Sequence, residues 1–206
     1  MNNLDLARII TQQAGFTVIP CYPRRHSKAK APMGDLTPHW KDNASKSKDT
    51  IVDWFGKRPA LIGIHCKAND FFAVDLDTPE AKATWNTWAE QYGLPEPGPW
   101  QKTARGAHFL FRQPDFDFPG SAGTLGSGID LRNENYICTG GSGSGYHWVI
   151  PITEEIPEAP EWLLAKIRGL ARQRPLIELS ERAAEPPEDP DWVADAWLKH
   201  YVSKIE

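Results

Sequence analysis

The sequence contains few cysteines and no long apolar run. Its three cysteines, Cys21, Cys66 and Cys138, are widely separated and form no CxxC pair. This spacing indicates neither a disulfide framework nor a zinc ribbon, and we expect buried free thiols. No stretch approaches the roughly 20 apolar residues that span a membrane, and residues 1–5 lack the charged and apolar regions of a signal peptide. We therefore expect a cytoplasmic protein with no membrane partner.

Glycine-rich nucleotide-binding motifs are also missing. The runs at residues 119–128 and 140–145 contain many glycines but match no Walker A pattern, and no GxGxxG precedes a predicted helix. An ATPase or a Rossmann dinucleotide site is therefore not indicated, and any helicase that works with this chain would be a separate protein or lie outside it. We interpret the two runs either as hairpin loops or as backbone donors for a phosphate.

An overall excess of basic residues is absent too, because the net charge is −4. The charge is unevenly distributed: residues 1–60 hold ten lysines and arginines against five acids, whereas residues 176–206 hold three against eight. A basic N-terminal region could face phosphates while the acidic tail stays away from them. The simpler interpretation of the basic stretch at residues 22–32 is a solvated surface loop.

The length of 206 residues suits one sizeable domain or two small lobes that share a core. Residues 176–191 are acidic and rich in proline, which predicts a linker. Residues 192–206 place tryptophans and other apolar residues near one face of a helix, which predicts an amphipathic C-terminal helix. This helix would either dock on the core or bind a partner.

Two hydrophobic periodicities alternate along the chain, and together they indicate a mixed α/β fold. Helices are predicted at residues 4–14, from Ser47 or Asp49 through Phe55, and at 81–92 and 161–173. Strands are predicted at residues 16–20, 60–66, 71–77, 100–103, 107–112, 129–132, 136–139 and 146–149. The glycine-rich residues 119–128 are predicted to be a loop.

The apolar run Phe71–Asp77 ends in two carboxylates separated by one residue. Because a strand alternates its side chains with period two, Asp75 and Asp77 should share one face, with Val74 and Leu76 buried behind them. Two like charges side by side favour a cation, and hard oxygen ligands suit Mg²⁺ or Mn²⁺. The alternative is a strand that ends in a polar turn, since the following Thr and Pro are also good turn residues.

Two further strands carry polar residues close to turns. His108 follows the Arg105-Gly106 turn and shares a strand face with Arg112, while Asp130 lies on the next predicted strand. A single histidine on a strand is more often structural than catalytic, but its place beside a turn and a second cation favours a site. Three carboxylates with a histidine and arginines are the residues of a two-metal phosphoryl-transfer site.

The residues and order of these motifs resemble those of a known family. The motifs are Lys30-Ala31-Pro32, Leu61-Ile62-Gly63-Ile64, Val74-Asp75-Leu76-Asp77, the run from Thr103 through His108 to Phe111, Gly128-Ile129-Asp130-Leu131-Arg132, Tyr136 and Ser142. In this order they resemble the bifunctional DNA primase/polymerase domain of the archaeo-eukaryotic primase superfamily. The resemblance extends over about residues 5 to 150.

The resemblance implies a two-lobed α/β (α+β) primase-polymerase fold in residues 1–175. An N-terminal lobe would occupy about residues 1–70, and an RNA-recognition-motif-like catalytic sheet, flanked by helices, about residues 71–150, followed by a closing helix. The resemblance also implies roles for eight residues. The implied metal ligands are Asp75, Asp77 and Asp130, His108 would contact the phosphates of the incoming nucleotide, and the other implied nucleotide or template contacts are Arg105, Arg132, Lys30 and Ser142.

The implied activity is template-directed DNA priming and polymerisation with two Mg²⁺ or Mn²⁺ ions. The partners would be a single-stranded DNA template and dNTP or NTP substrates, in the replication or repair of a plasmid, phage or other mobile element. The alternative is a non-catalytic module that binds single-stranded nucleic acid or a nucleotide through the basic loop and exposed aromatic residues such as Trp40 or Trp100. A rolling-circle nuclease fits less well because the histidines stand alone. An Asp-x-Asp-x-Thr phosphatase fits less well because Pro79 occupies the position where it needs threonine or a small residue. A glycosyltransferase would leave His108 and Asp130 without a role.

Overall fold

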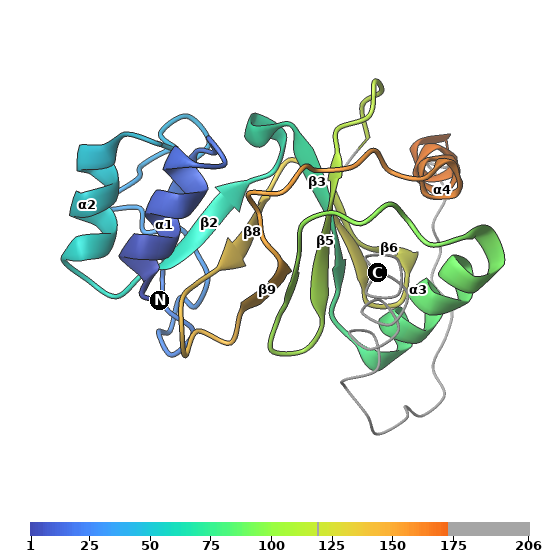
Figure 1. Ribbon diagram of the computed structural model, residues 1–206, viewed down its shortest axis with the longest axis horizontal. Coiled ribbons are helices and arrows are strands. Elements are labelled where there is room, and N and C mark those ends of the chain that lie inside the picture. Colours follow the sequence, from blue (N-terminus) through green and yellow to red (C-terminus); the bar gives the residue numbers. More distant parts are fainter. Residues whose placement is uncertain (119, 173–206) are drawn as a thin grey trace, which may run out of the picture.

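The computed structural model describes residues 1–118 and 120–172. Within these residues the chain forms four α-helices and two antiparallel sheets, so the predicted α+β class is confirmed (Figure 1). The predicted linker at 176–191 and the C-terminal helix at 192–206 lie outside the described residues. No helix in the described part is long and apolar enough to cross a membrane.

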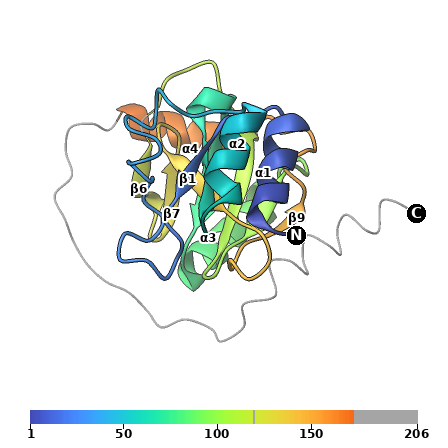
Figure 2. The ribbon, with the colours of Figure 1, turned by 90° about the vertical axis from the view of Figure 1, so that its left-hand side faces the viewer.

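The smaller sheet has three strands in the order β1-β2-β8. Its strands are β1 (Val18–Cys21), β2 (Leu61–His65) and β8 (Tyr136–Thr139). Helices α1 (Asn3–Gln12) and α2 (Lys48–Gly56) lie side by side over it (Figure 2). Residues Ile10, Ile51 and Ile62, from one helix, the other helix and the sheet, are fully buried in one cluster. The third strand comes from a segment far along the chain, after most strands of the larger sheet.

The larger sheet has six strands in the order β6-β7-β3-β5-β4-β9. Its strands are β3 (Phe71–Leu76), β4 (Trp100–Lys102), β5 (Ala107–Arg112), β6 (Ser121–Gly126), β7 (Ile129–Arg132) and β9 (His147–Ile150). A short 3₁₀ turn, η1 (Lys67–Asn69), joins β2 to β3. Helices α3 (Pro79–Tyr92) and α4 (Glu161–Arg172) contribute buried side chains to the core on one side of this sheet.

The start of α3 follows from its sequence. Thr78 caps the helix by accepting a hydrogen bond from the Ala81 N–H at 3.1 Å, and Pro79 occupies the first turn, where a missing N–H costs nothing. Further along the helix, Trp85 is fully buried and stacks on Phe109 of β5, with 5.4 Å between the ring centroids. Trp85 therefore belongs to the core on this side of the sheet.

Strand β3 is buried on both faces, which explains its continuous apolar run. Its residues Phe72, Val74 and Leu76 belong to the core with α3 and α4. The alternate residues Phe71 and Ala73 belong to the core with α1, α2 and the smaller sheet. Because side chains alternate along a strand, Asp75 continues this second face, toward the smaller sheet.

Two expectations about local structure are wrong. The glycine-rich stretch 119–128 is not all loop, because Ser121–Gly126 forms the edge strand β6, which pairs antiparallel with β7. The backbone of β7 supplies the hydrogen-bonding partners that compensate for the low strand propensity of glycine. Trp100 is not an exposed stacking residue: it is 2% exposed and stacks on Phe109. Trp40 is half-buried against His65 and Tyr136.

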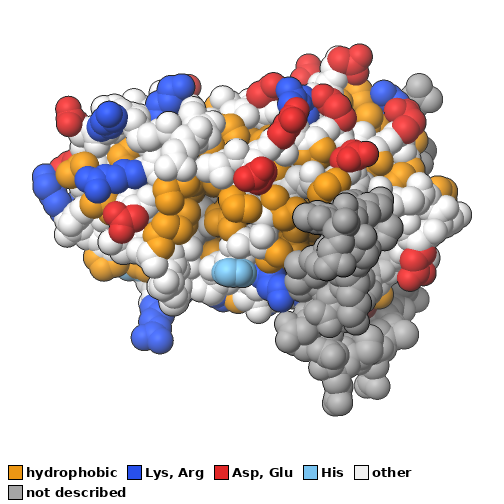
Figure 3. Space-filling model, in the orientation of Figure 1, with side chains coloured by type: hydrophobic (Ala, Val, Ile, Leu, Met, Phe, Trp, Pro, Cys, Tyr) orange, Lys and Arg blue, Asp and Glu red, His pale blue; other side chains and the backbone are white. Residues whose placement is uncertain are grey.

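Charge is unevenly distributed over the surface. In the orientation of Figure 1, acidic side chains gather along the upper right of the molecule, toward α4, while lysines and arginines are more frequent at the end that carries α1 and α2 (Figure 3). This matches the excess of basic residues in the first part of the sequence. The three cysteines are free and buried, as expected.

Candidate active site

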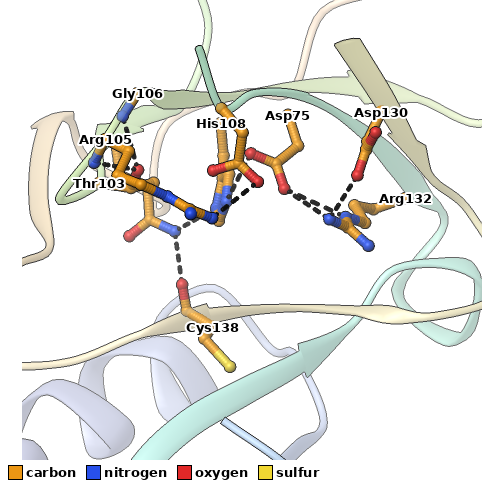
Figure 4. Close-up of polar contacts among 10 residues, drawn as sticks. Asp75, Thr103, Arg105, Gly106, His108, Asp130, Arg132 and Cys138 are labelled. Atoms are coloured by element: carbon orange, nitrogen blue, oxygen red, sulfur yellow. Dashed lines mark hydrogen bonds and ion pairs between the residues drawn. The ribbon is translucent and has the colours of Figure 1, made fainter. Parts of the chain in front are cut away.

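A row of four polar residues crosses the centre of the larger sheet. In the strand register, Asp75 of β3 lies opposite Asp130 of β7 on one side and His108 of β5 on the other, and His108 lies opposite Gln101 of β4. Directly opposed residues in an antiparallel sheet project to the same face. The four side chains therefore line up on the face that looks toward the smaller sheet. Figure 4 shows three of them, Asp75, His108 and Asp130.

Asp77 joins this row from just beyond the end of β3. Its N–H donates to the carbonyl of Gly128 at 3.0 Å, which ties the segment to the β6–β7 hairpin. On the other side, the turn before β5 approaches so closely that a Cβ atom on Gly106 would collide with the Leu76 carbonyl oxygen. Glycine at 106 therefore lets the neighbouring Arg105 reach Asp77, with 3.4 Å between Nη2 and Oδ2.

The three aspartates form a cluster that could hold a metal ion. One carboxylate oxygen from each of Asp75, Asp77 and Asp130 lies within 4.8 Å of the other two. Oδ1 of Asp75 is buried without a hydrogen-bond partner of good geometry, so it has a lone pair to offer. An all-carboxylate donor set with such an oxygen fits a hard divalent cation such as Mg²⁺ or Mn²⁺.

Arg132 of β7 compensates the charge of two of these carboxylates. Its Nη2 donates to Oδ2 of Asp75 at 2.9 Å and to Oδ2 of Asp130 at 2.7 Å. Burial of Asp75 raises its pKa, but His108 and Arg132 outweigh that effect and lower the pKa to about 2. Burial likewise lowers the pKa of Arg132, and the carboxylates around it, first of all Asp75, produce a net increase. The Asp75 carboxylate is therefore firmly ionised.

Gln101 fixes the orientation of His108 and was missed by the sequence interpretation. The Gln101 side chain is fully buried, and its Nε2 lies 2.9 Å from the carbonyl oxygen of Cys138 and 2.8 Å from Nδ1 of His108. The amide must present its NH₂ group to the carbonyl, so Nδ1 accepts the second hydrogen and the ring proton resides on Nε2. Nε2 in turn lies 3.3 Å from Oδ1 of Asp75.

A cavity of about 250 Å³ opens beside this row, where the two sheets meet. It is lined from the larger sheet by Asp75, His108 and Arg132. From the other side it is lined by Lys30 and by a group of residues at and after β8: Asn135, Tyr136, Ile137, Cys138 and Tyr146. Burial raises the pKa of both tyrosines, so they remain phenols. We call this the catalytic cavity.

A second cavity, of about 600 Å³, is lined by Arg24, Arg25 and the loop Ser142–Gly145. Of the residues expected to form one site, the structure brings Asp75, Asp77, Asp130, His108 and Arg132 together, with Arg105 at Asp77 and Lys30 on the cavity wall. Ser142 lies apart, in the second cavity. The residues that line this cavity with Ser142 come from segments far apart in the sequence.

The chain is similar to a known family over most of its length. A family described as bifunctional DNA primase/polymerase, N-terminal, matches residues 7–162, which is well over half of the chain. The matched region contains all strands of both sheets and every residue of the polar row. No curated protein matches the chain.

Proposed function

The chain belongs to the family of bifunctional DNA primase/polymerase N-terminal domains, and we propose that it is itself a template-directed DNA primase/polymerase. It would transfer nucleotides from dNTPs or NTPs to a 3′ hydroxyl group or to an initiating nucleotide, on a single-stranded DNA template. The general class, a nucleotidyltransferase, follows from the family, whereas priming and polymerisation by this chain are the proposal.

One observation carries the proposal: the Asp75, Asp77 and Asp130 carboxylates converge beside His108, and Asp75 and His108 line one cavity. We propose that these carboxylates hold two Mg²⁺ or Mn²⁺ ions. Such ions activate an attacking hydroxyl group and neutralise the pyrophosphate that leaves. His108 lies 3.3 Å from the Asp75 carboxylate and lines the cavity beside it, whereas a histidine that only packed in the core would line no cavity.

The other side chains of the site would bind the triphosphate. His108, with its proton on Nε2, is a hydrogen-bond donor suited to a phosphate oxygen, and Lys30 and Arg105 add positive charge at the cavity and its edge. Arg132 now holds Asp75 and Asp130. When the substrate enters, the planar guanidinium would release these carboxylates and bind phosphate oxygens instead. A carboxylate and a phosphate each present a pair of acceptor oxygens that fits the guanidinium.

The test is a synthesis assay with purified protein, Mg²⁺ or Mn²⁺, a single-stranded template and labelled nucleotides, run with and without a primer. We expect template-dependent products, which Asp130→Ala abolishes. The control is Asp117→Ala, which removes a carboxylate that is 97% exposed and remote from the row and should leave synthesis unchanged. Absence of products that depend on Asp130 would refute the proposal.

The synthesis assay, together with a DNA-binding assay, distinguishes the proposed enzyme from the non-catalytic alternative. A binding module of this fold would bind single-stranded DNA in a salt-sensitive manner, and that binding would survive loss of all three aspartates without any synthesis by the wild type. The burial of Trp100 removes one of the two aromatic residues on which this alternative depended.

A further inference from the structure

Arg24 and Arg25 differ from the other arginines of the molecule. Among the arginines whose side chains the structure describes, these two alone have no carboxylate partner, whereas the rest form ion pairs. Both are exposed and both line the second cavity. None of the residues that line this cavity is acidic. The cavity therefore carries positive charge that the described part of the protein does not neutralise.

The loop opposite these arginines adds hydrogen-bond donors. The N–H groups of Gly143 and Gly145 have no acceptor among the described residues, and both glycines have positive φ angles, of 81° and 83°. Ser142 and Ser144 accept hydrogen bonds through their hydroxyl oxygens, which leaves each hydroxyl proton available. Backbone N–H groups in such turns, together with arginines, are a recurring arrangement for binding anions.

Arg24 contacts the loop on the other side of the cavity. A Cβ atom on Gly145 would collide with Nη1 of Arg24, so the guanidinium group lies directly against the glycine backbone. Only glycine combines this close approach with its positive φ angle. The exposed guanidinium group of Arg24 thus lies against the loop that carries the Gly143 and Gly145 N–H groups.

We propose that the second cavity binds a phosphate group of the nucleic-acid strand, next to the catalytic cavity. This inference rests on the proposed function. Residues of one short segment line both cavities, since Cys138 and Tyr146 face the catalytic cavity and Ser142–Gly145 face the second. The second cavity has no carboxylates for a metal–nucleotide complex and no aromatic ring on which a base could stack. A backbone phosphate, bound without metal, is the ligand that this lining fits best.

The test is the binding of a fluorescent oligothymidylate in EDTA, measured by anisotropy over a range of salt concentrations. The double variant Arg24→Gln/Arg25→Gln should bind roughly tenfold more weakly, and its log K against log[salt] slope should be shallower by roughly 0.7, the change expected when one phosphate of a single strand is no longer neutralised. The matched control is Arg8→Gln/Arg58→Gln, which removes two arginines that already have carboxylate partners. Equal binding by the two double variants would overturn the proposal.

A second measurement separates the strand from the nucleotide as the occupant. Binding of a dNTP with Mn²⁺ should be unchanged in Arg24→Gln/Arg25→Gln, and synthesis should recover at saturating template. Loss of dNTP binding with normal strand binding would overturn the proposal. If the wild type makes no product but strand binding still depends on these arginines, the proposed function fails and the phosphate site stands. If synthesis occurs and the arginines have no effect on strand binding, the phosphate site fails and the proposed function stands.

Discussion

The two cavities share a chain segment but handle charge in opposite ways. In the catalytic cavity, Asp75 is 6% exposed at its side chain and lies between two nitrogen donors, Nε2 of His108 and the guanidinium group of Arg132. In the second cavity, Arg24 and Arg25 lie in solvent, and neither forms an ion pair with a described residue. One site is internally compensated, and the other is open to an external anion.

This difference has an energetic consequence. Buried charges are costly to desolvate, so the carboxylates of the catalytic cavity need their arginine when no metal is bound. Exposed arginines remain hydrated and stabilise the fold little, so their loss should affect binding but hardly the fold. We therefore expect variants of the first cavity to change both chemistry and stability, and variants of the second to change only the affinity for the strand.

The largest effect should come from Asp75→Asn. This change keeps the size of the side chain but removes a charge central to the carboxylate cluster, so synthesis should fall by roughly a thousandfold, or about 4 kcal/mol. Metal-free binding of single-stranded DNA should remain within a factor of about two, because that binding depends on the second cavity. Assays of synthesis and of anisotropy on the same preparation test the contrast, and a parallel loss of both would break it.

A smaller effect should follow from Arg132→Gln. In EDTA, Asp75 and Asp130 would face each other without the guanidinium, and the free energy of unfolding should fall by about 3 kcal/mol. Mn²⁺ should raise the melting temperature of this variant by more than it raises that of the wild type, since the ion replaces the missing cation. The control is Arg58→Gln, whose half-exposed ion pair with Asp35 should contribute under about 1 kcal/mol. Equal melting temperatures for the two variants would contradict internal compensation.

Acid should weaken the metal-free protein through the same residue. The pKa of Asp75 is lowered to about 2 from its ordinary 3.8, so its stabilising contribution is complete above about pH 4 and disappears as the pH falls to 2. The contribution amounts to roughly 2 kcal/mol. Urea unfolding of the wild type and of Asp75→Asn across this pH range measures it, and the wild type should lose more stability. Parallel curves would show that Asp75 is not held ionised by its neighbours.

The smallest effect should come from Gln101→Leu. Without the amide, Nδ1 of His108 loses its donor and the ring proton can move from Nε2, so kcat/KM for the nucleotide should fall about tenfold, mainly through KM. The tautomer is measurable by ¹⁵N NMR of the histidine ring, a signal that a merely destabilising change would not alter. An unchanged tautomer in a folded variant would remove Gln101 from the site.

Local patterns were sufficient for most elements and for singling out the three aspartates that cluster. The period-two run Phe71–Asp77 predicted that Val74 and Leu76 would be buried behind Asp75, and both are fully buried. The helix predicted at 81–92 is present as α3, which begins slightly earlier, at Pro79, after its Thr78 cap. Strand β6 was missed because its glycines and serine have turn-like propensities, and its hydrogen-bonding partner is a neighbouring strand.

The sequence by itself determined the residue types of the site, the α+β class and the family, because these depend on local periodicity and on the order of short motifs. Only the tertiary structure decided which residues meet. The strand register places Asp130 and His108 on either side of Asp75 and brings Gln101 to His108. The return of β8 to the smaller sheet supplies the Cys138 carbonyl that orients Gln101. The loop after β8 places Ser142 in the second cavity, apart from the catalytic cavity. These contacts join residues far apart in the chain, and their register depends on pairing and packing across the whole domain, which no local pattern encodes.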